Sequence, residues 1–259
     1  MLDAIGAAFA AGGARVLDVH ADPDHHRAVF TLAGPPGGLS AAVLAGARVA
    51  VERIDLRGHD GIHPRVGALD VAPIVHLSDA DRGAACAEAL VLGDLLGREL
   101  GLPVHLYGAL AQGRTRAELR RPGGLDGRVA EFGPPDLHPT AGAVLVAARP
   151  PLVAFNVEIE GDVDAARAIA TGLRLDLPSV KALGLRLEGR DVVQVSTNIE
   201  DHTRVTAADV VRYVGERAPV VAAELVALAP EAAFANWPSD VPLRGFDPAR
   251  HLIERALHS

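Results

Sequence analysis

The second half of the chain has the clearest alternation of apolar and polar positions. Apolar runs with a period of two predict strands, and apolar positions three and four apart predict helices. The predicted strands are 152–159, 181–187, 192–198 and 219–228, and the predicted helices are 163–174 and 206–217. Asp162 and Thr206 precede the two helices at positions typical of an N-cap. The resulting order, β-α-β-β-α-β, is that of a ferredoxin-like unit.

The first half repeats most of this order. It predicts helices over 1–11, 40–54 and 79–100, and strands over 15–20, 27–33, 68–77, 103–107 and 141–148. Ser40 is the expected start of the second helix. The opening order, α-β-β-α-β, is the same unit without its first strand. Either another segment fills that position or the reading frame starts too late. We expect the late start, with residues encoded upstream restoring solubility.

These patterns together predict an α/β fold, an α+β sandwich. It consists of two ferredoxin-like βαββαβ subdomains, of which the N-terminal one lacks its first strand. We expect an N-terminal subdomain over 1–148, a C-terminal subdomain over 149–230, and a C-terminal cap or tail over 231–259. The long segment 109–140, rich in Gly, Pro and Arg, is expected to be a functional or mobile loop, or alternatively a solvated arginine face.

Composition narrows the class of protein. The chain has 259 residues and is 49% apolar, with six phenylalanines, two tyrosines and one tryptophan. The core is therefore expected to consist of Ala, Val, Leu and Ile. A net charge of −8 argues against general nucleic-acid binding, and no apolar run is long enough to span a membrane. The single cysteine, Cys86, excludes an internal disulfide. We expect a cytoplasmic protein.

The segment 58–70 contains the strongest candidate chemistry. His59 and His63 are four residues apart, as in a helical zinc pair, but the glycines and Pro64 favour a loop. A loop with two histidines and Arg65 suits acid–base work near neutral pH. The alternative is a solvated turn.

Two further loops are candidates. The segment 22–27 ends in Arg27, which enters a strand and is able to pair with a carboxylate in a bidentate way. A histidine-rich metal site is the alternative, with these members: His20, His25, His26, His59 and His63. The segment 132–142 contains glycines that allow backbone amides to approach a flat or anionic ligand. It is not a P-loop, and the chain has no Rossmann fingerprint.

These segments resemble the glutamate formimidoyltransferase family over about residues 1–230. The most specific stretch is HPRVGALDV at 63–71. Other matching blocks, in the same order as in the family, are DPDHHRAVFTL at 22–32, VHLYG at 104–108, FGP at 132–134, GAVLVAARPPLVAFNV at 142–157, VKALGLRLE at 180–188, QVSTN at 194–198 and ELVALAP at 224–230.

The resemblance implies two α/β subdomains with folate between them, and a homodimer. It implies transfer of a formimidoyl group from N-formimidoyl-glutamate, or a related amidine, to nitrogen 5 of tetrahydrofolate, with no metal. The family's catalytic histidine falls on His63. Its folate-binding loop falls on Gly133, Pro134, Pro135, Asp136, Leu137, His138, Pro139, Thr140, Ala141 and Gly142. Arg27, Arg65, Asp70 and Asn156 match positions expected to bind substrate. The implied partners are small molecules only.

The chain also departs from the family. Its members open with a strand and an Asn-x-Ser-Glu-Gly motif, which are absent here. His26 stands where they have Asn, and Ala222-Ala223 replaces Gly-Ser. Two alternatives therefore remain. One is a catalytically altered paralogue that binds folate or a similar small anion without transfer, and the other is a histidine metal-binding protein.

Overall fold

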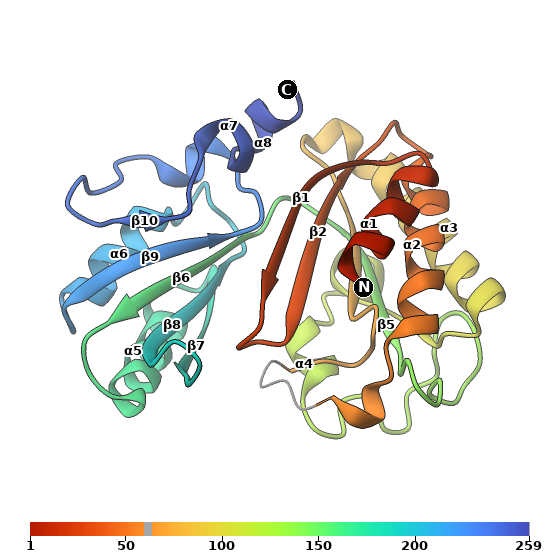
Figure 1. Cartoon of the computed structure of the whole chain (residues 1–259), viewed down its shortest axis with the longest axis horizontal. Coiled ribbons are helices and arrows are strands. Elements are labelled where there is room, and N and C mark those ends of the chain that lie inside the picture. The colour runs from red at the N-terminus through yellow and green to blue at the C-terminus, as the bar shows by residue number, and fades with distance from the viewer. Residues whose placement is uncertain (60–63, 259) are drawn as a thin grey trace. The chain divides into compact units, whose positions relative to one another are not determined.

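The computed structural model describes residues 1–59 and 64–258. Two compact units form (Figure 1). The first unit comprises Met1–Val16 and Leu32–Pro150, and the second comprises Leu17–Thr31 and Pro151–Ser259. Most of an early β-hairpin is thus grouped with the C-terminal half of the chain. No helix of the described residues is long and apolar enough to cross a membrane.

The second unit is built on a five-stranded sheet. Its elements are β6 (Val153–Ile159), α5 (Val163–Asp176), β7 (Val180–Leu187), β8 (Val192–Ile199), α6 (Ala207–Gly215), β9 (Val220–Val226) and β10 (Leu243–Arg244). The strand order is β10-β9-β6-β8-β7, with β10 parallel to β9 and the other pairs antiparallel. The first strand, β6, thus lies between the third and the fourth, which confirms the predicted ferredoxin-like unit.

Strand alternation gives this sheet two chemically different faces. One face carries Val157, Val195 and Leu225, which pack with buried residues of α5 and α6 such as Leu173 and Val210. The neighbouring positions point to the other face and include Asn156, Ser196, Gln194 and Glu224. We call this second side the polar face.

The C-terminal segment is part of the same core. It contains a 3₁₀ turn at Glu231–Phe234, α7 (Pro248–His251) and α8 (Ile253–Ala256). Trp237 packs edge-on against Phe155, with ring centroids 5.7 Å apart. Phe234 contacts both rings. The segment therefore completes the hydrophobic core of the second unit.

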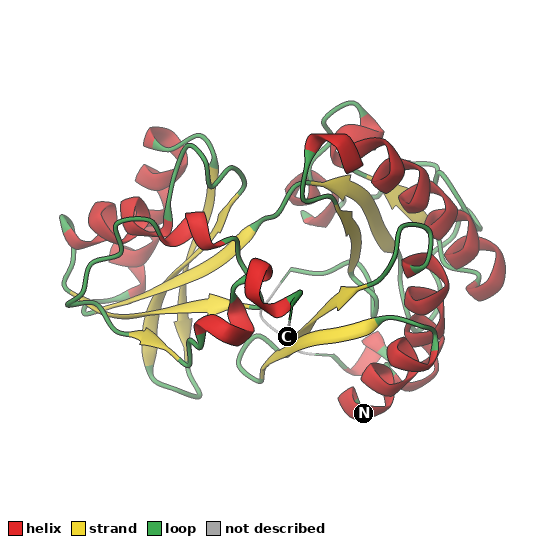
Figure 2. Cartoon of the chain, turned by 90° about the horizontal axis from the view of Figure 1, so that it is seen from above, coloured by secondary structure: helices red, strands yellow, loops and turns green. Residues whose placement is uncertain are grey.

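The first unit combines helices with a small parallel sheet (Figure 2). Its elements are α1 (Leu2–Ala11), α2 (Leu39–Arg53), β3 (Val71–Val75), α3 (Arg82–Leu100), β4 (Val104–Leu106), α4 (Arg116–Arg120) and β5 (Val144–Arg149), with 3₁₀ turns at Leu56–Gly58, Asp79–Asp81 and Gly108–Ala111. The sheet order is β3-β5-β4. A helix, α3, packs on this sheet, α2 packs on α3, and α1 packs on α2.

The strands of the first half do not form the expected ferredoxin-like sheet. The predicted element order is present, but β1 (Arg15–Asp22) and β2 (Arg27–Ala33) form a separate two-stranded sheet, and β3, β5 and β4 run parallel. The second unit shows the physical reason. There, β8 and β9 belong to one sheet because β6 lies between them and bonds to both. The first half has no strand at the position of β6 among its described residues, so β2 and β3 have no common neighbour.

The predicted role of Ser40 is also wrong in detail. The helix α2 begins at Leu39 after Gly38, and no side chain of its own N-cap closes it. The Glu88 carboxylate of α3 accepts the N–H groups of Gly37, Leu39 and Ser40, at 3.0, 2.6 and 3.0 Å. A tertiary contact thus satisfies the helix terminus, which local sequence cannot reveal.

Candidate functional site

The two glycine-rich candidate loops of the first unit lie side by side. Gly67 and Gly142 form an antiparallel bridge. The Ala143 N–H donates to the Val66 carbonyl, and the Ala68 N–H donates to the Ala141 carbonyl, both at 2.9 Å. The loop 64–70 and the loop 133–142, more than sixty positions apart in the chain, therefore form one structure.

The loop 133–142 combines a fixed backbone with an open surface. Gly133 and Gly142 have φ angles of +81° and +69°, a region that favours glycine. His138 and Gly142 exchange two backbone hydrogen bonds of 3.0 and 2.9 Å. The His138 Nδ1 accepts the Ala141 N–H at 3.1 Å, so its ring proton lies on Nε2. Leu137 is 58% exposed, although it is apolar.

Asp70 and Arg65 are held by protein contacts. The Asp70 carboxylate accepts the Val66 N–H at 2.9 Å and forms an ion pair with Arg120 of α4. The Arg65 guanidinium donates to the His59 carbonyl. These contacts support a role in positioning the loop 64–70. The predicted catalytic histidine, His63, lies outside the described residues.

The tip of the β1–β2 hairpin is fixed by Arg190, in the turn between β7 and β8. Arg190 donates to Asp24 at 3.2 Å and to Asp22 at 3.1 Å. The Gly189 N–H donates to Asp24 at 3.1 Å. Asp22 also pairs with His25 at 2.8 Å. Burial raises the pKa of Asp22, but hydrogen bonds from His25 and the charges of His25 and Arg190 outweigh it and lower the pKa.

His26 lies in this tip with a φ angle of +50°. Asn and His are both enriched in this left-handed region. The replacement of the family's Asn by His26 therefore has a backbone explanation and is not by itself a change in substrate chemistry. The neighbouring Arg27 is partly buried at the start of β2.

The polar face places Glu224 beside Asn156 on adjacent strands. Asn156 is buried, and so is one oxygen of Glu224; this oxygen has no hydrogen-bond partner among the described residues. Glu224 lies 3.7 Å from Arg190 and 4.0 Å from His20. Gln194 is completely buried, and within residues 1–59 and 64–258 neither the nitrogen nor the oxygen of its amide has a hydrogen-bond partner. These groups retain hydrogen-bonding capacity that a ligand is able to use.

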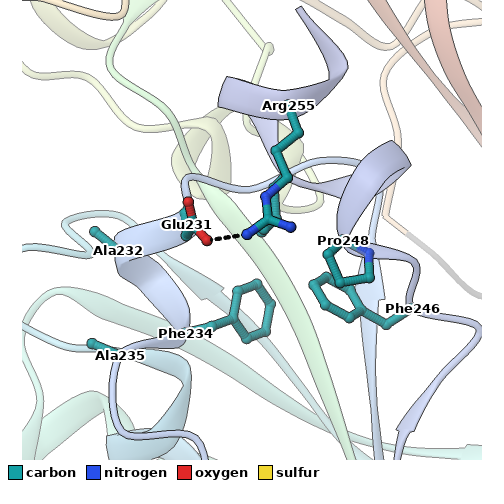
Figure 3. A pocket seen from close by; sticks show the side chains of 8 residues that line it. Glu231, Ala232, Phe234, Ala235, Phe246, Pro248 and Arg255 are labelled. Atoms are coloured by element: carbon teal, nitrogen blue, oxygen red, sulfur yellow. Dashed lines mark hydrogen bonds and ion pairs between the residues drawn. The ribbon is translucent and has the colours of Figure 1, made fainter. Parts of the chain in front are cut away.

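Two cavities of the second unit are weaker candidates for a functional site. One of about 460 Å³ lies between Phe234, Phe246 and Pro248, and its Glu231 and Arg255 are paired at 2.5 Å (Figure 3). Another, of about 400 Å³, includes Glu158 and Arg244, which pair at 2.9 Å, and also Arg186 and Asp191, which pair at 2.5 Å. In both cavities these charged side chains satisfy one another.

The histidine-rich metal hypothesis has no support from the described geometry. Within residues 1–59 and 64–258, no group of three or more His, Cys, Asp or Glu side chains is placed to hold a metal ion. His25 pairs with Asp22, and His20 lies near Glu224. His63, another histidine of the hypothesised metal site, lies outside the described residues.

Comparison with known proteins decides the family. The model of the formiminotransferase domain, N-terminal subdomain, matches residues 1–149. The glutamate formimidoyltransferase of Streptococcus pyogenes serotype M1 is 32% identical, over 95% of this chain and 89% of that protein. This chain belongs to the formiminotransferase family. The corresponding protein of Thermoplasma acidophilum is also 32% identical, over 94% of this chain and 87% of its own length.

Other members of the formiminotransferase family are longer. The formimidoyltransferase-cyclodeaminase of Rattus norvegicus is 36% identical over 89% of this chain, which spans only 47% of that protein. The family resemblance predicted from the motifs is thereby confirmed.

Several residues that contact the candidate loops or lie on the polar face could not be singled out from the sequence. Arg120 was assigned only to a charged segment, yet it pairs with Asp70. Arg190, Gln194 and Glu224 lie within or beside motifs that matched the family. Alternation along β8 and β9 is the sequence signal for two of them, because it places Gln194 and Glu224 on the polar face of the sheet.

Proposed function

We propose that this protein is a folate-dependent formimidoyltransferase. It moves a formimidoyl group from N-formimidoyl-glutamate, or a related amidine donor, to nitrogen 5 of tetrahydrofolate. The observation that carries the proposal is the joining of the two family motifs, the loop 64–70 and the loop 133–142, at Gly67 and Gly142. Similarity to two glutamate formimidoyltransferases over nearly the whole chain supports it.

The reaction exchanges one carbon–nitrogen bond for another. Nitrogen 5 attacks the amidine carbon and forms a tetrahedral intermediate. The bond from that carbon to the glutamate nitrogen then breaks, and the proton lost by nitrogen 5 is gained by the leaving amine. We assign this proton transfer to His63, because an imidazole titrates near neutral pH and serves as base and then as acid.

The loop 133–142 is proposed to bind folate. Its backbone is held by the bridge to Gly67 and by the His138 contacts, while half of its residues are exposed to solvent. A fixed loop loses little conformational entropy on binding. The exposed side chain of Leu137 offers apolar surface to a flat ring. Arg27 is proposed to bind a substrate carboxylate.

Substitution of His63 tests the proposal. In His63→Ala, transfer is expected to fall by about 10²–10⁴-fold, the usual contribution of a general acid–base. Tetrahydrofolate affinity, measured by calorimetry, is expected to stay the same. The control is His59→Ala, a histidine of the same segment. A folded wild-type protein that transfers no formimidoyl group from any amidine donor would contradict the proposal.

The second candidate is a paralogue that binds folate without transfer. The departures at His26 and at Ala222-Ala223 motivate it, although the left-handed backbone at His26 weakens the first of these. It predicts tetrahydrofolate binding that His63→Ala leaves unchanged, together with no turnover by the wild-type protein.

We also propose a cytoplasmic homodimer. The family resemblance motivates the dimer, and the single cysteine suits a reducing compartment. Light scattering on the purified protein tests the dimer, and fractionation of cells of the natural host tests the cytoplasmic location. A monomer across the micromolar range, or recovery outside the cytoplasm, contradicts them.

A further inference from the structure

We propose that Glu224 on the polar face binds an amidine edge, the planar N–C–N group with two parallel N–H donors. This inference rests on the proposed function, whose two substrates both contain such an edge. The formimidoyl donor presents it as an amidinium, and the pterin ring of folate presents it as a ring N–H beside a 2-amino group. Glu224 is thus inferred to be a specificity-determining residue.

The first argument is the unused capacity of Glu224. A carboxylate offers about four acceptor positions. One oxygen of Glu224 is buried and accepts no hydrogen bond from the described residues, and its basic neighbours, Arg190 and His20, stay at 3.7 and 4.0 Å. Buried carboxylates without hydrogen bonds are costly, so a native structure keeps one only where something compensates. A ligand with two N–H donors would compensate.

The second argument is that Arg190 is not free to move closer. Two of its nitrogens donate to Asp22 and Asp24 at the hairpin tip. Its third nitrogen faces Glu224 at 3.7 Å. Arg190 therefore lies beside the Glu224 carboxylate without donating a hydrogen bond to it, which leaves acceptor positions for an amidine edge.

The third argument comes from two amides on the same face of the sheet as Glu224, one on the adjacent strand β6 and one on the next strand, β8. Asn156 is its direct neighbour on β6 and is buried. Gln194 is on the same face of β8, opposite Glu158, and has neither amide atom satisfied. A carboxylate with two amides presents acceptors and donors together, which suits a planar group carrying both. This is an observation independent of Glu224 itself.

The contacts of Glu224 also differ from those of a tight structural ion pair on the same face. The neighbouring pair on this face, Glu158 and Arg244, is closed by two contacts of 2.9 Å. The same chain thus builds a tight ion pair where only stability is needed. At Glu224 it leaves the longer distances described above.

Glu224→Gln is the test, because it keeps the shape and removes the charge. The control is Glu160→Gln, an exposed carboxylate just beyond β6. Circular dichroism and thermal melting show whether each variant is folded. If Glu224→Gln does not fold, Glu224→Asp is tested in its place. Two quantities are measured: the KM for N-formimidoyl-glutamate and, by calorimetry, the Kd for tetrahydrofolate.

At least a tenfold rise in one of these quantities is expected, with the control within twofold of wild type. A rise confined to the donor KM, with kcat largely kept, assigns the edge to the amidinium. A rise in the tetrahydrofolate Kd assigns it to the pterin. If a folded variant changes neither quantity by more than twofold, the inference is overturned. An inactive wild type would instead contradict the proposed function, and the calorimetric measurement would still decide the pterin assignment.

Discussion

Gly67 and Gly142 form the bridge that joins the loop 64–70 to the loop 133–142, and neither has room for a side chain. A Cβ on Gly67 would lie 1.7 Å from the Ala143 carbonyl oxygen, and one on Gly142 would lie 2.3 Å from that of Val66. The glycines of the two motifs are therefore needed for close packing of backbones.

Gly67→Ala is accordingly expected to be strongly destabilising. The new methyl group meets backbone that cannot move without breaking the bridge, and we expect a loss of about 3 kcal/mol or more in the free energy of unfolding. Urea denaturation measures it. The control is Gly58→Ala, since a Cβ at Gly58 would meet no atom of the described residues within 4 Å. Equal stability of the two variants would show that the loops are not joined in this way.

Glu88 is expected to stabilise the first unit by accepting the N–H groups at the start of α2. Glu88→Ala leaves the N–H groups at the start of α2 without their acceptor, at a cost of about 2 kcal/mol. Thermal melting compares it with Glu99→Ala, which loses only an exposed contact to Arg98. Melting temperatures that agree within about one degree would contradict the capping role, because 2 kcal/mol corresponds to several degrees.

His105 is expected to make the protein less stable in mild acid. It is 3% exposed, and burial lowers its pKa below the ordinary value of 6.5, against the opposing charge of Glu131. The unfolded chain therefore binds a proton more readily than the folded one. Stability contributed by the neutral ring is present above pH 6.5 and is lost as the pH falls through the lowered pKa.

Denaturation from pH 8 to pH 5 checks this expectation. His105→Phe, of similar volume, should lose less stability over that range than wild type. His258→Phe, at an exposed position, serves as the control. Wild type and His105→Phe with parallel stability profiles would refute the role of His105.

Asp22 is expected to make stability depend on pH in a lower range than His105 does. Its lowered pKa means that its contribution to stability is present above the ordinary value of 3.8 and is lost as the pH falls through the lowered value. Asp22→Asn should therefore cost about 1–3 kcal/mol at pH 7, the value of a hydrogen bond between charged groups. The difference from wild type should narrow below pH 4. Asp164→Asn, at an exposed helix position, is the control, and a difference that stays constant with pH would contradict the role of Asp22.

The sequence predicted most elements because periodicity is a local property. Helices α3 and α5 and strands β6 and β8 follow directly from the spacing of apolar residues. The order β-α-β-β-α-β also determined the second unit, since all its strands are present to join one sheet. The motifs around Gly67 and Gly142 determined the family.

Tertiary structure alone decided which strands share a sheet in the first half, because pairing depends on a common neighbour and not on the propensity of β2 or β3. It likewise decided that Glu88 closes α2 and that Arg190 holds Asp22 and Asp24. Hydrogen bonds between residues dozens of positions apart leave no periodic trace in the sequence. The unsatisfied groups of Gln194 and Glu224 became visible for the same reason: satisfaction of a polar group is a property of its three-dimensional surroundings.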